Sequence, residues 1–197
     1  MGVSIAVFAS GSGSNFQSLV EVARQEHWPE QISLLICDRP GAKVLKRAQA
    51  LDVESYALAP KSFAAKAKYE QAVLEILKQF QIRWIVLAGY MRLIGPTLLT
   101  AYSNRIVNIH PSLLPAFPGK NAIEQAFSYP VKVSGVTIHF VDEGMDTGPI
   151  IAQTPIEIAP EDTIETFAKK VHQVEHKLYP RVVYDLITGK ISCPSLD

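Results

Sequence analysis

Cysteine is scarce in this sequence, with Cys37 and Cys193 as the two examples among 197 residues. Two cysteines so far apart form neither a disulfide framework nor the paired spacing of a zinc-binding motif. Their scarcity excludes a small domain held together by disulfides and favours a reducing compartment. We therefore expect a cytoplasmic protein.

Net charge and long apolar runs are lacking as well. The 19 basic side chains balance the 19 acidic ones, and no basic cluster predicts a surface for nucleic acid. No apolar stretch approaches the roughly 20 residues of a membrane helix, and the N-terminus lacks the positive flank of a secretory signal. We expect no nucleic-acid partner and no membrane partner, so any anionic ligand is small.

Apolar residues are plentiful, at 48% of the chain, which is enough to build one core at this length. We expect a single domain over residues 1–197. Apolar strand patterns alternate with helical patterns in the first part of the chain, which predicts an α/β fold: an open, mostly parallel, twisted sheet with helices on both faces. The predicted strands are 3–9, 32–37, 53–58 and 82–88, and the predicted helices are one beginning near Phe16, 42–51 and 62–80.

The second part of the chain has a different pattern. A short helix at 96–102 and a strand at 105–109 precede a proline-rich segment, 110–119, that predicts an ordered loop. Strands at 133–141 and 149–158 predict a hairpin-like C-terminal half. A helix at 163–179 is expected to stop at Pro180, with a further helical turn or two up to Gly189.

A glycine-rich turn, Gly-Ser-Gly-Ser-Asn at 11–15, joins the first strand to the first helix. Backbone amides at such a helix start can bind an anion. Phe16 stands where a dinucleotide fingerprint requires its third glycine, and no Lys-Ser/Thr pair follows to make a nucleotide P-loop. A monophosphate fits better than either cofactor. The alternative is an ordinary turn with Asn15 as the N-cap of the helix.

The segment 172–176, His-Gln-Val-Glu-His, matches the H-x-x-E-H signature of a zinc protease. No third ligand is apparent, so we expect no metal. Two other interpretations stay open: a partly exposed amphipathic helix, or a helix from which Glu175 reaches a substrate group.

Asn108 and His110 are two residues apart on a predicted strand, so both side chains point to the same face. They lie at the carboxyl end of that strand, which is where open α/β sheets bind ligands. Acidic residues at 142, 143 and 146 follow the strand that carries His139. A carboxylate that reaches His110 would orient the ring and keep it protonated. The alternatives are a core histidine and solvent-exposed acids.

Four segments together resemble the folate-dependent phosphoribosylglycinamide formyltransferases: 11–15, Gly-Tyr-Met-Arg at 89–92, Asn-Ile-His-Pro-Ser-Leu-Leu-Pro at 108–115 and Asp-Glu-Gly-Met-Asp-Thr-Gly-Pro at 142–149. The resemblance covers essentially the whole chain. It implies a Rossmann-like formyltransferase fold with a phosphate-binding half at about 1–100 and a catalytic and folate-binding half at about 101–197. It also implies transfer of a formyl group from 10-formyltetrahydrofolate to the amine of glycinamide ribonucleotide in purine biosynthesis.

The resemblance assigns roles by position. Asn108, His110 and Asp146 are the implied catalytic residues, with the first two stabilising a tetrahedral intermediate and Asp146 assisting proton transfer. His139 and Ser112 are supporting residues. The substrate would contact Gly13, Ser14, Asn15, Glu175 and Lys66, and the folate would contact Tyr90, Met91, Arg92, Leu93, Ile94, Asp142 and Glu143.

The resemblance implies two small-molecule partners, the ribonucleotide and the folate co-substrate, with no metal. We expect a monomer or weak homodimer. A transfer RNA formyltransferase is disfavoured because the chain ends at Asp197 and has no net positive charge. The remaining alternatives are a formyltetrahydrofolate hydrolase and a non-catalytic sensor of a phosphate ligand.

Overall fold

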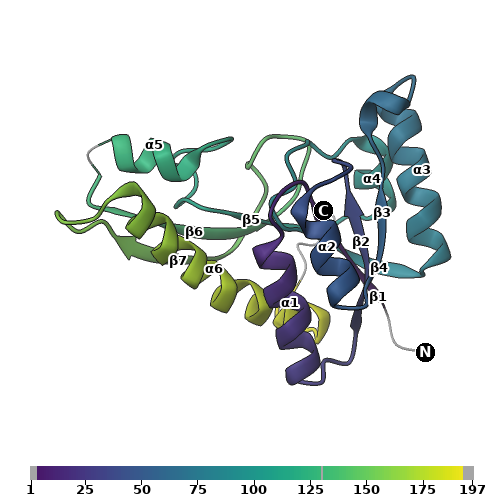
Figure 1. The fold of residues 1–197 in the computed structure, drawn as a ribbon, viewed down its shortest axis with the longest axis horizontal. Coiled ribbons are helices and arrows are strands. Elements are labelled where there is room, and N and C mark those ends of the chain that lie inside the picture. Colours follow the sequence, from purple (N-terminus) through teal and green to yellow (C-terminus); the bar gives the residue numbers. More distant parts are fainter. Residues whose placement is uncertain (1–3, 130, 193–197) are drawn as a thin grey trace.

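A computed structural model describes residues 4–129 and 131–192, and these form one seven-stranded sheet flanked by helices (Figure 1). The predicted strand start at Val3 and the second cysteine, Cys193, lie outside the described residues. In chain order the elements are β1 (Ser4–Ala9), α1 (Ser14–Gln25), β2 (Gln31–Cys37), α2 (Lys43–Ala50), β3 (Glu54–Ala57), the 3₁₀ turn η1 (Pro60–Ser62), α3 (Lys66–Gln79), β4 (Ile82–Leu87), α4 (Pro96–Ala101), β5 (Ile106–His110), α5 (Ala122–Ser128), β6 (Val133–Phe140), β7 (Ile150–Glu157) and α6 (Ile164–Ile187).

The strand order is β3-β2-β1-β4-β5-β6-β7. The pairs from β3 through to β5 are parallel, whereas β5–β6 and β6–β7 are antiparallel. Strand β1 lies in the middle of the parallel part, and all its residues from Ile5 to Ala9 are buried. Such a run is apolar throughout because helices cover both faces of a parallel sheet. The predicted α/β class, the mostly parallel sheet and the C-terminal hairpin are confirmed.

Two apolar clusters lie on opposite faces of the sheet. Phe16 of α1 and Phe167 of α6 belong to one cluster, together with residues of α2 and α5. Tyr69 of α3 and Leu98 of α4 belong to the other. Figure 1 shows α3 and α4 on the far side of the strands from α1, α2 and α6. The helices therefore leave the carboxyl ends of the strands available for a site.

Two helices differ from the predictions: α3 begins later than expected, and α5 was not expected at all. Helix α3 begins at Lys66 rather than at 62, because the chain first forms the turn η1 at Pro60–Ser62. Helix α5 was not predicted from the sequence. It starts after Asn121, whose φ of 59° is left-handed, and it buries only Ala122 and Ala126 among its seven residues. Two buried residues are too few to produce a recognisable helical periodicity in the sequence.

The predicted stop at Pro180 is wrong, because α6 continues to Ile187. Proline has no N–H, so inside a helix it leaves the carbonyl four residues earlier without its donor. Here that carbonyl belongs to His176, and the Ser18 hydroxyl of α1 donates to it at 2.9 Å. The neighbouring helix replaces the lost hydrogen bond, and the helix is not interrupted.

In the part of the chain that the structure describes, no helix combines the length and the apolar character needed to cross a bilayer.

Candidate active site

The register between β5 and β6 brings four polar side chains to one end of the sheet. In this antiparallel ladder Asn108 lies opposite His139, and His110 lies opposite Thr137. Asn108 and His139 also contact each other, with 3.1 Å between Asn108 Nδ2 and His139 Nε2. His110 and His139 are both nearly fully buried.

Asp146 connects these side chains. Its Oδ2 lies 3.4 Å from His110 Nδ1, and its Oδ1 lies 3.6 Å from His139 Nε2. Asn108 Nδ2 donates to Oδ1 at 3.4 Å, and the Gly119 amide donates to Oδ2 at 2.7 Å. The backbone at Asp146 has a φ of 59°, the left-handed region that Asp and Asn tolerate better than most residues. The structure therefore places Asn108, His110 and Asp146 within one small site.

Opposing effects set the charge of Asp146. Burial raises the pKa of this carboxyl, but the hydrogen bond from His139, the Gly119 amide and the charge of His110 together lower it below its ordinary value. The group is therefore a carboxylate at neutral pH. A buried carboxylate next to two imidazole rings can accept a proton and can favour the charged form of a ring beside it.

The other ring nitrogen of His110 is fixed by the proline-rich loop. His110 Nε2 lies 2.8 Å from the Phe117 carbonyl, so it is a donor. The opposite nitrogen, Nδ1, faces Asp146, so both ring nitrogens have an oxygen acceptor nearby. Ser112 Oγ donates to the Ala116 carbonyl at 2.5 Å, and Thr137 Oγ1 donates to the Ser112 carbonyl at 2.7 Å.

Thr137 is a site-supporting residue that the sequence interpretation missed. It lies two positions before His139 on β6, so strand alternation places both side chains on the same face. That spacing is a usable signal, but the sequence does not show which residue of β5 lies opposite.

The glycine-rich turn begins α1. Gly13 is the N-cap, with a φ of 77°, and a Cβ there would overlap the side chain of Val44 in α2. No side chain caps this helix end. The alternative of Asn15 as the N-cap is wrong: Asn15 lies inside the helix and its Nδ2 donates to Glu175 Oε2 at 3.2 Å. The amides at Ser14 and Asn15 therefore stand at a helix start that has no side-chain acceptor of its own.

Glu175 lies on α6, next to this turn. It is 4% exposed, and His172 Nδ1 lies 2.8 Å from the same oxygen that Asn15 contacts. The rings of His172 and His176 stack with 6.4 Å between centroids. Within residues 4–129 and 131–192, no group of three or more His, Cys, Asp and Glu side chains is arranged to hold a metal ion.

The segment after β4 contains the first set of residues assigned to the folate. The Tyr90 hydroxyl lies 2.9 Å from that of Tyr69, and the Arg92 guanidinium lies over the Tyr69 ring at 5.8 Å. Burial raises the pKa of both phenols, so both stay neutral. The Met91 amide donates to Ser10 Oγ at 2.8 Å, which ties the segment to the end of β1.

Apolar side chains are exposed on both segments assigned to the folate. Met91 and Leu93 follow β4, and Met145 lies in the loop between β6 and β7; each is about half exposed, at 49%, 53% and 53%. Ile94 is buried. Asp142 Oδ1 accepts from Gly144 and Thr147 and so shapes its own loop, and Glu143 is exposed.

Lys66 stands at the first position of α3, on the sheet face opposite α1 and α6. Its ammonium lies 3.8 Å from Glu70, a buried carboxylate that also accepts from the Gly95 amide at 2.6 Å. The structure therefore shows Lys66 in an ion pair, and its predicted contact with the substrate stays a prediction.

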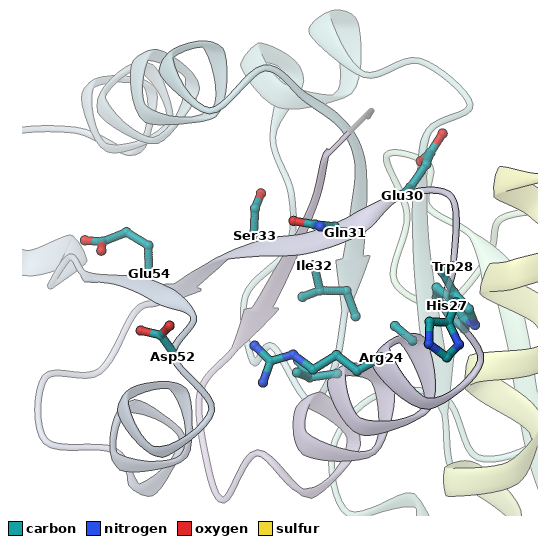
Figure 2. A pocket seen from close by; sticks show the side chains of 11 residues that line it. Arg24, His27, Trp28, Glu30, Gln31, Ile32, Ser33, Asp52 and Glu54 are labelled. Atoms are coloured by element: carbon teal, nitrogen blue, oxygen red, sulfur yellow. The ribbon is translucent and has the colours of Figure 1, made fainter. Parts of the chain in front are cut away.

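A hollow of about 730 Å³ lies elsewhere, beside β2 and α1 (Figure 2). Arg24 and His27 line it from the α1 side, and Asp52 and Glu54 line it from the other. None of the predicted site residues contributes to it, so it is separate from the cluster around Asp146.

Comparisons with known proteins show which family the chain resembles in sequence and fold. A sequence profile described as formyl transferase matches residues 3–183. The phosphoribosylglycinamide formyltransferase of Bacillus subtilis is 56% identical over 182 residues, which are 92% of this chain and 93% of that protein. A crystal structure of phosphoribosylglycinamide formyltransferase from Bacillus halodurans is 54% identical, with a TM-score of 0.91 and coverage of 95% and 96% of the two chains. Glycinamide ribonucleotide transformylase 1 from Geobacillus kaustophilus is 56% identical, with the same TM-score and coverage of 94% and 99%.

A match over most of the chain, at this identity and with this similarity of fold, shows the family: the chain belongs to the formyl transferases.

Proposed function

We propose that this protein transfers a formyl group from 10-formyltetrahydrofolate to the amine of glycinamide ribonucleotide, a step of purine biosynthesis. The observation that carries the proposal is the contact of Asp146 with Asn108 and His110 at the carboxyl end of β5. Two relatives that this chain covers to 93% and 99% have names describing formyl transfer to this ribonucleotide.

The ribonucleotide would bind along α1 and α6. Its phosphate would accept from the backbone amides at Gly13, Ser14 and Asn15, where the helix dipole favours negative charge. The lack of a side-chain cap on α1 supports this assignment, because those amides stay available. The glycinamide end would approach Glu175. Lys66 lies on the opposite face of the sheet and pairs with Glu70, so this proposal gives it no role in binding the phosphate.

The catalytic side chains would act on the amine and on the formyl oxygen. Asn108 and protonated His110 would donate to the oxygen as it gains negative charge, and donors of this kind are each worth roughly 10²–10³ in rate. His110 would use Nδ1, because Nε2 already donates to the Phe117 carbonyl at 2.8 Å, whereas Nδ1 lies at the longer distance of 3.4 Å from Asp146. Asp146 would accept the proton that the attacking amine loses and pass it on towards the departing nitrogen. His139 holds Asp146 in place, and Ser112 holds the loop behind His110.

The folate co-substrate would lie between the segments at 90–94 and 142–146. The exposed Met91, Leu93 and Met145 suit the flat face of a ring system, because thioether and aliphatic groups pack well on aromatic rings. Arg92, Asp142 and Glu143 would supply polar contacts around it. When bound, this co-substrate supplies the formyl group.

A direct assay tests the proposal. Purified protein is incubated with 10-formyltetrahydrofolate, with and without glycinamide ribonucleotide, and the release of tetrahydrofolate is followed together with the formylated product. Release that requires the ribonucleotide and matches product formation is the expected result. Release without the ribonucleotide would indicate a hydrolase, and binding of the ribonucleotide without turnover would indicate a phosphate-ligand sensor; either result would overturn the proposal.

Two further assignments accompany this proposal. We propose a cytoplasmic location, supported by the similarity to a bacterial purine enzyme. We also propose a monomer or weak homodimer, which sedimentation velocity over a range of concentrations would test.

A further inference from the structure

Three polar side chains from two helices meet behind the glycine-rich turn, and the catalytic scheme leaves one of them without a role. His172 and Glu175 lie three residues apart on α6, and Asn15 lies on α1. His172 Nδ1 and Asn15 Nδ2 both contact Glu175 Oε2, at 2.8 and 3.2 Å. Neither of these contacts uses Oε1.

Unpaired polar atoms lie in the same region. Asn15 Oδ1 and His176 Nε2 are buried and have no hydrogen-bond partner. Buried polar groups are normally paired, so such atoms need an explanation. Asn15 Oδ1 belongs to the same amide that contacts Glu175, so hydrogen bonding around Glu175 is incomplete within the protein.

We infer that His172 is a positioning residue, which holds Glu175 Oε2 so that Oε1 is presented to a donor group of the ribonucleotide. This inference rests on the proposed function. It also explains the H-x-x-E-H pattern without a metal: the first histidine and the glutamate form a pair on one helix face, as residues three apart do.

The charge of His172 supports this role. Its hydrogen bond to Glu175 raises the pKa of the ring, against a smaller opposing effect of burial. The ring is half exposed, at 51% of its side chain, so it exchanges protons with solvent freely. His172 and Glu175 both act on the pKa of His176 on α6, on which Arg47 of α2 and Glu21 of α1 also act. Glu175 also raises the pKa of Tyr179, after the larger effect of burial.

A pH dependence of substrate affinity follows. Because the pKa of His172 is raised, the ring keeps its proton through mildly acidic pH and loses it as pH rises through the raised value. The donor then loses its positive charge, so the hydrogen bond to Glu175 becomes weaker but is not lost, because the neutral ring still carries a donor N–H. Affinity for the ribonucleotide should fall, whereas the chemical step at Asp146 should change little.

The test uses His172→Leu, which removes the donor, and His172→Gln, which keeps a neutral donor. His27→Gln is the matched control, because His27 is exposed and lines the separate hollow in Figure 2. KM for glycinamide ribonucleotide and kcat are measured at about pH 6 and about pH 8.5, on either side of a raised histidine pKa. Ionisation of the substrate affects all proteins alike, so the ratio of variant to wild-type KM isolates the enzyme.

At the lower pH, His172→Leu should raise KM by about tenfold with kcat within about twofold, since a charge-assisted hydrogen bond is lost. The KM ratio should fall to about threefold at the higher pH, because the neutral wild-type ring still donates a weaker hydrogen bond to Glu175. His172→Gln should give a smaller rise than His172→Leu, and His27→Gln should match wild type throughout. A KM ratio that does not change with pH, or a loss confined to kcat, would overturn the inference.

The inference and the proposed function fail in different ways. If the wild-type protein does not use the ribonucleotide, the proposed function fails. If the wild type is active and His172→Leu keeps its KM at both pH values, only the positioning role fails. Circular dichroism and the melting temperature show that the variants are folded, and an NMR titration of the His172 ring in the wild type gives an independent result. A ring pKa at or below that of free histidine would also overturn the inference.

Discussion

Replacing Asp146 with asparagine removes the charge at the centre of the site and changes little else. Asparagine has nearly the same shape and tolerates the left-handed backbone at this position, where φ is 59°. Its side-chain oxygen can still accept from the Gly119 amide, which lies 2.7 Å from Oδ2. An alanine would add backbone strain to the loss of charge, so the asparagine variant gives the cleaner measurement.

The size of the effect follows from the contacts of the carboxylate. Asp146 lies 3.4 Å from His110 and 3.6 Å from His139, and its side chain is only 12% exposed. Loss of a general base in such a site lowers kcat by about 10²–10⁴. The contacts from His139 and the Gly119 amide also lose their charged acceptor, so the loss should lie towards the upper end of that range.

The same carboxylate contributes to stability in a defined pH range. The pKa of Asp146 is lowered in the folded protein, so its contribution is fully present above the ordinary value for an unfolded Asp, about 3.9. That contribution is lost as pH falls through the lowered folded value. Wild type should therefore be more stable than Asp146→Asn at pH 7, by about 1–2 kcal/mol, and the difference should shrink in strong acid.

The assay is kcat for formyl transfer, together with urea unfolding at neutral and acidic pH. Asp52→Asn is the matched control, because Asp52 also has a positive φ, 49°, but is exposed and lines the separate hollow. It should keep wild-type turnover. Turnover of Asp146→Asn within about tenfold of wild type would refute the role of a general base, and an unchanged stability difference across pH would refute the charge analysis.

Two further substitutions test the frame around the site. Gly13→Ala should lower the free energy of unfolding in urea by about 2–3 kcal/mol, because its φ is positive and a Cβ would overlap Val44. Gly41→Ala is the control, because Gly41 also has a positive φ but has open space around it, and this substitution should cost less. Equal losses in the two variants would contradict the overlap at Gly13. Ser18→Ala should lower stability by about 1 kcal/mol, because the carbonyl that Pro180 leaves without a helical donor loses its replacement. Ser18→Thr keeps the hydroxyl and should restore most of that stability.

The frame of the sheet could be predicted from the sequence because its signals are local. A run such as β4, Ile82–Leu87, is rich in Ile, Val and Trp apart from Arg83 and is soon followed by Gly89, so it predicts a largely buried strand without knowledge of its neighbours. The helix at α1 follows from apolar residues at helical spacing after a glycine-rich turn. Features of this kind depend on a few adjacent residues, and the structure agrees with them closely.

The two clearest errors depend on contacts between distant segments. Helix α6 continues through Pro180, and Ser18, far away in the sequence, supplies the donor that the proline lacks. Helix α5 is short and is held by packing of Ala126 into the larger apolar cluster. In both cases a contact with a distant segment stabilises the helix, and the residues next to the helix in sequence do not indicate that contact.

The site itself was only partly predictable. Asn108 and His110 could be paired from strand alternation, but three acids in one loop were candidates for the carboxylate. The structure separates them by geometry: Asp142 shapes its own loop, and Asp146 reaches His110. That choice depends on a left-handed backbone at Asp146, which sequence patterns do not reveal.

The register of β5 against β6 is the feature on which this geometry depends most. Side chains alternate between the two faces of a strand, so a slip of one residue would send His139 to the opposite face from Asn108. The loop between β6 and β7 then brings Asp146 back to the end of the β5–β6 ladder. Gly148 makes that return possible, because a Cβ at this position would overlap the Phe140 carbonyl at the end of β6. The ladder sets the direction of the histidines, and the tight return at Gly148 brings the carboxylate to them.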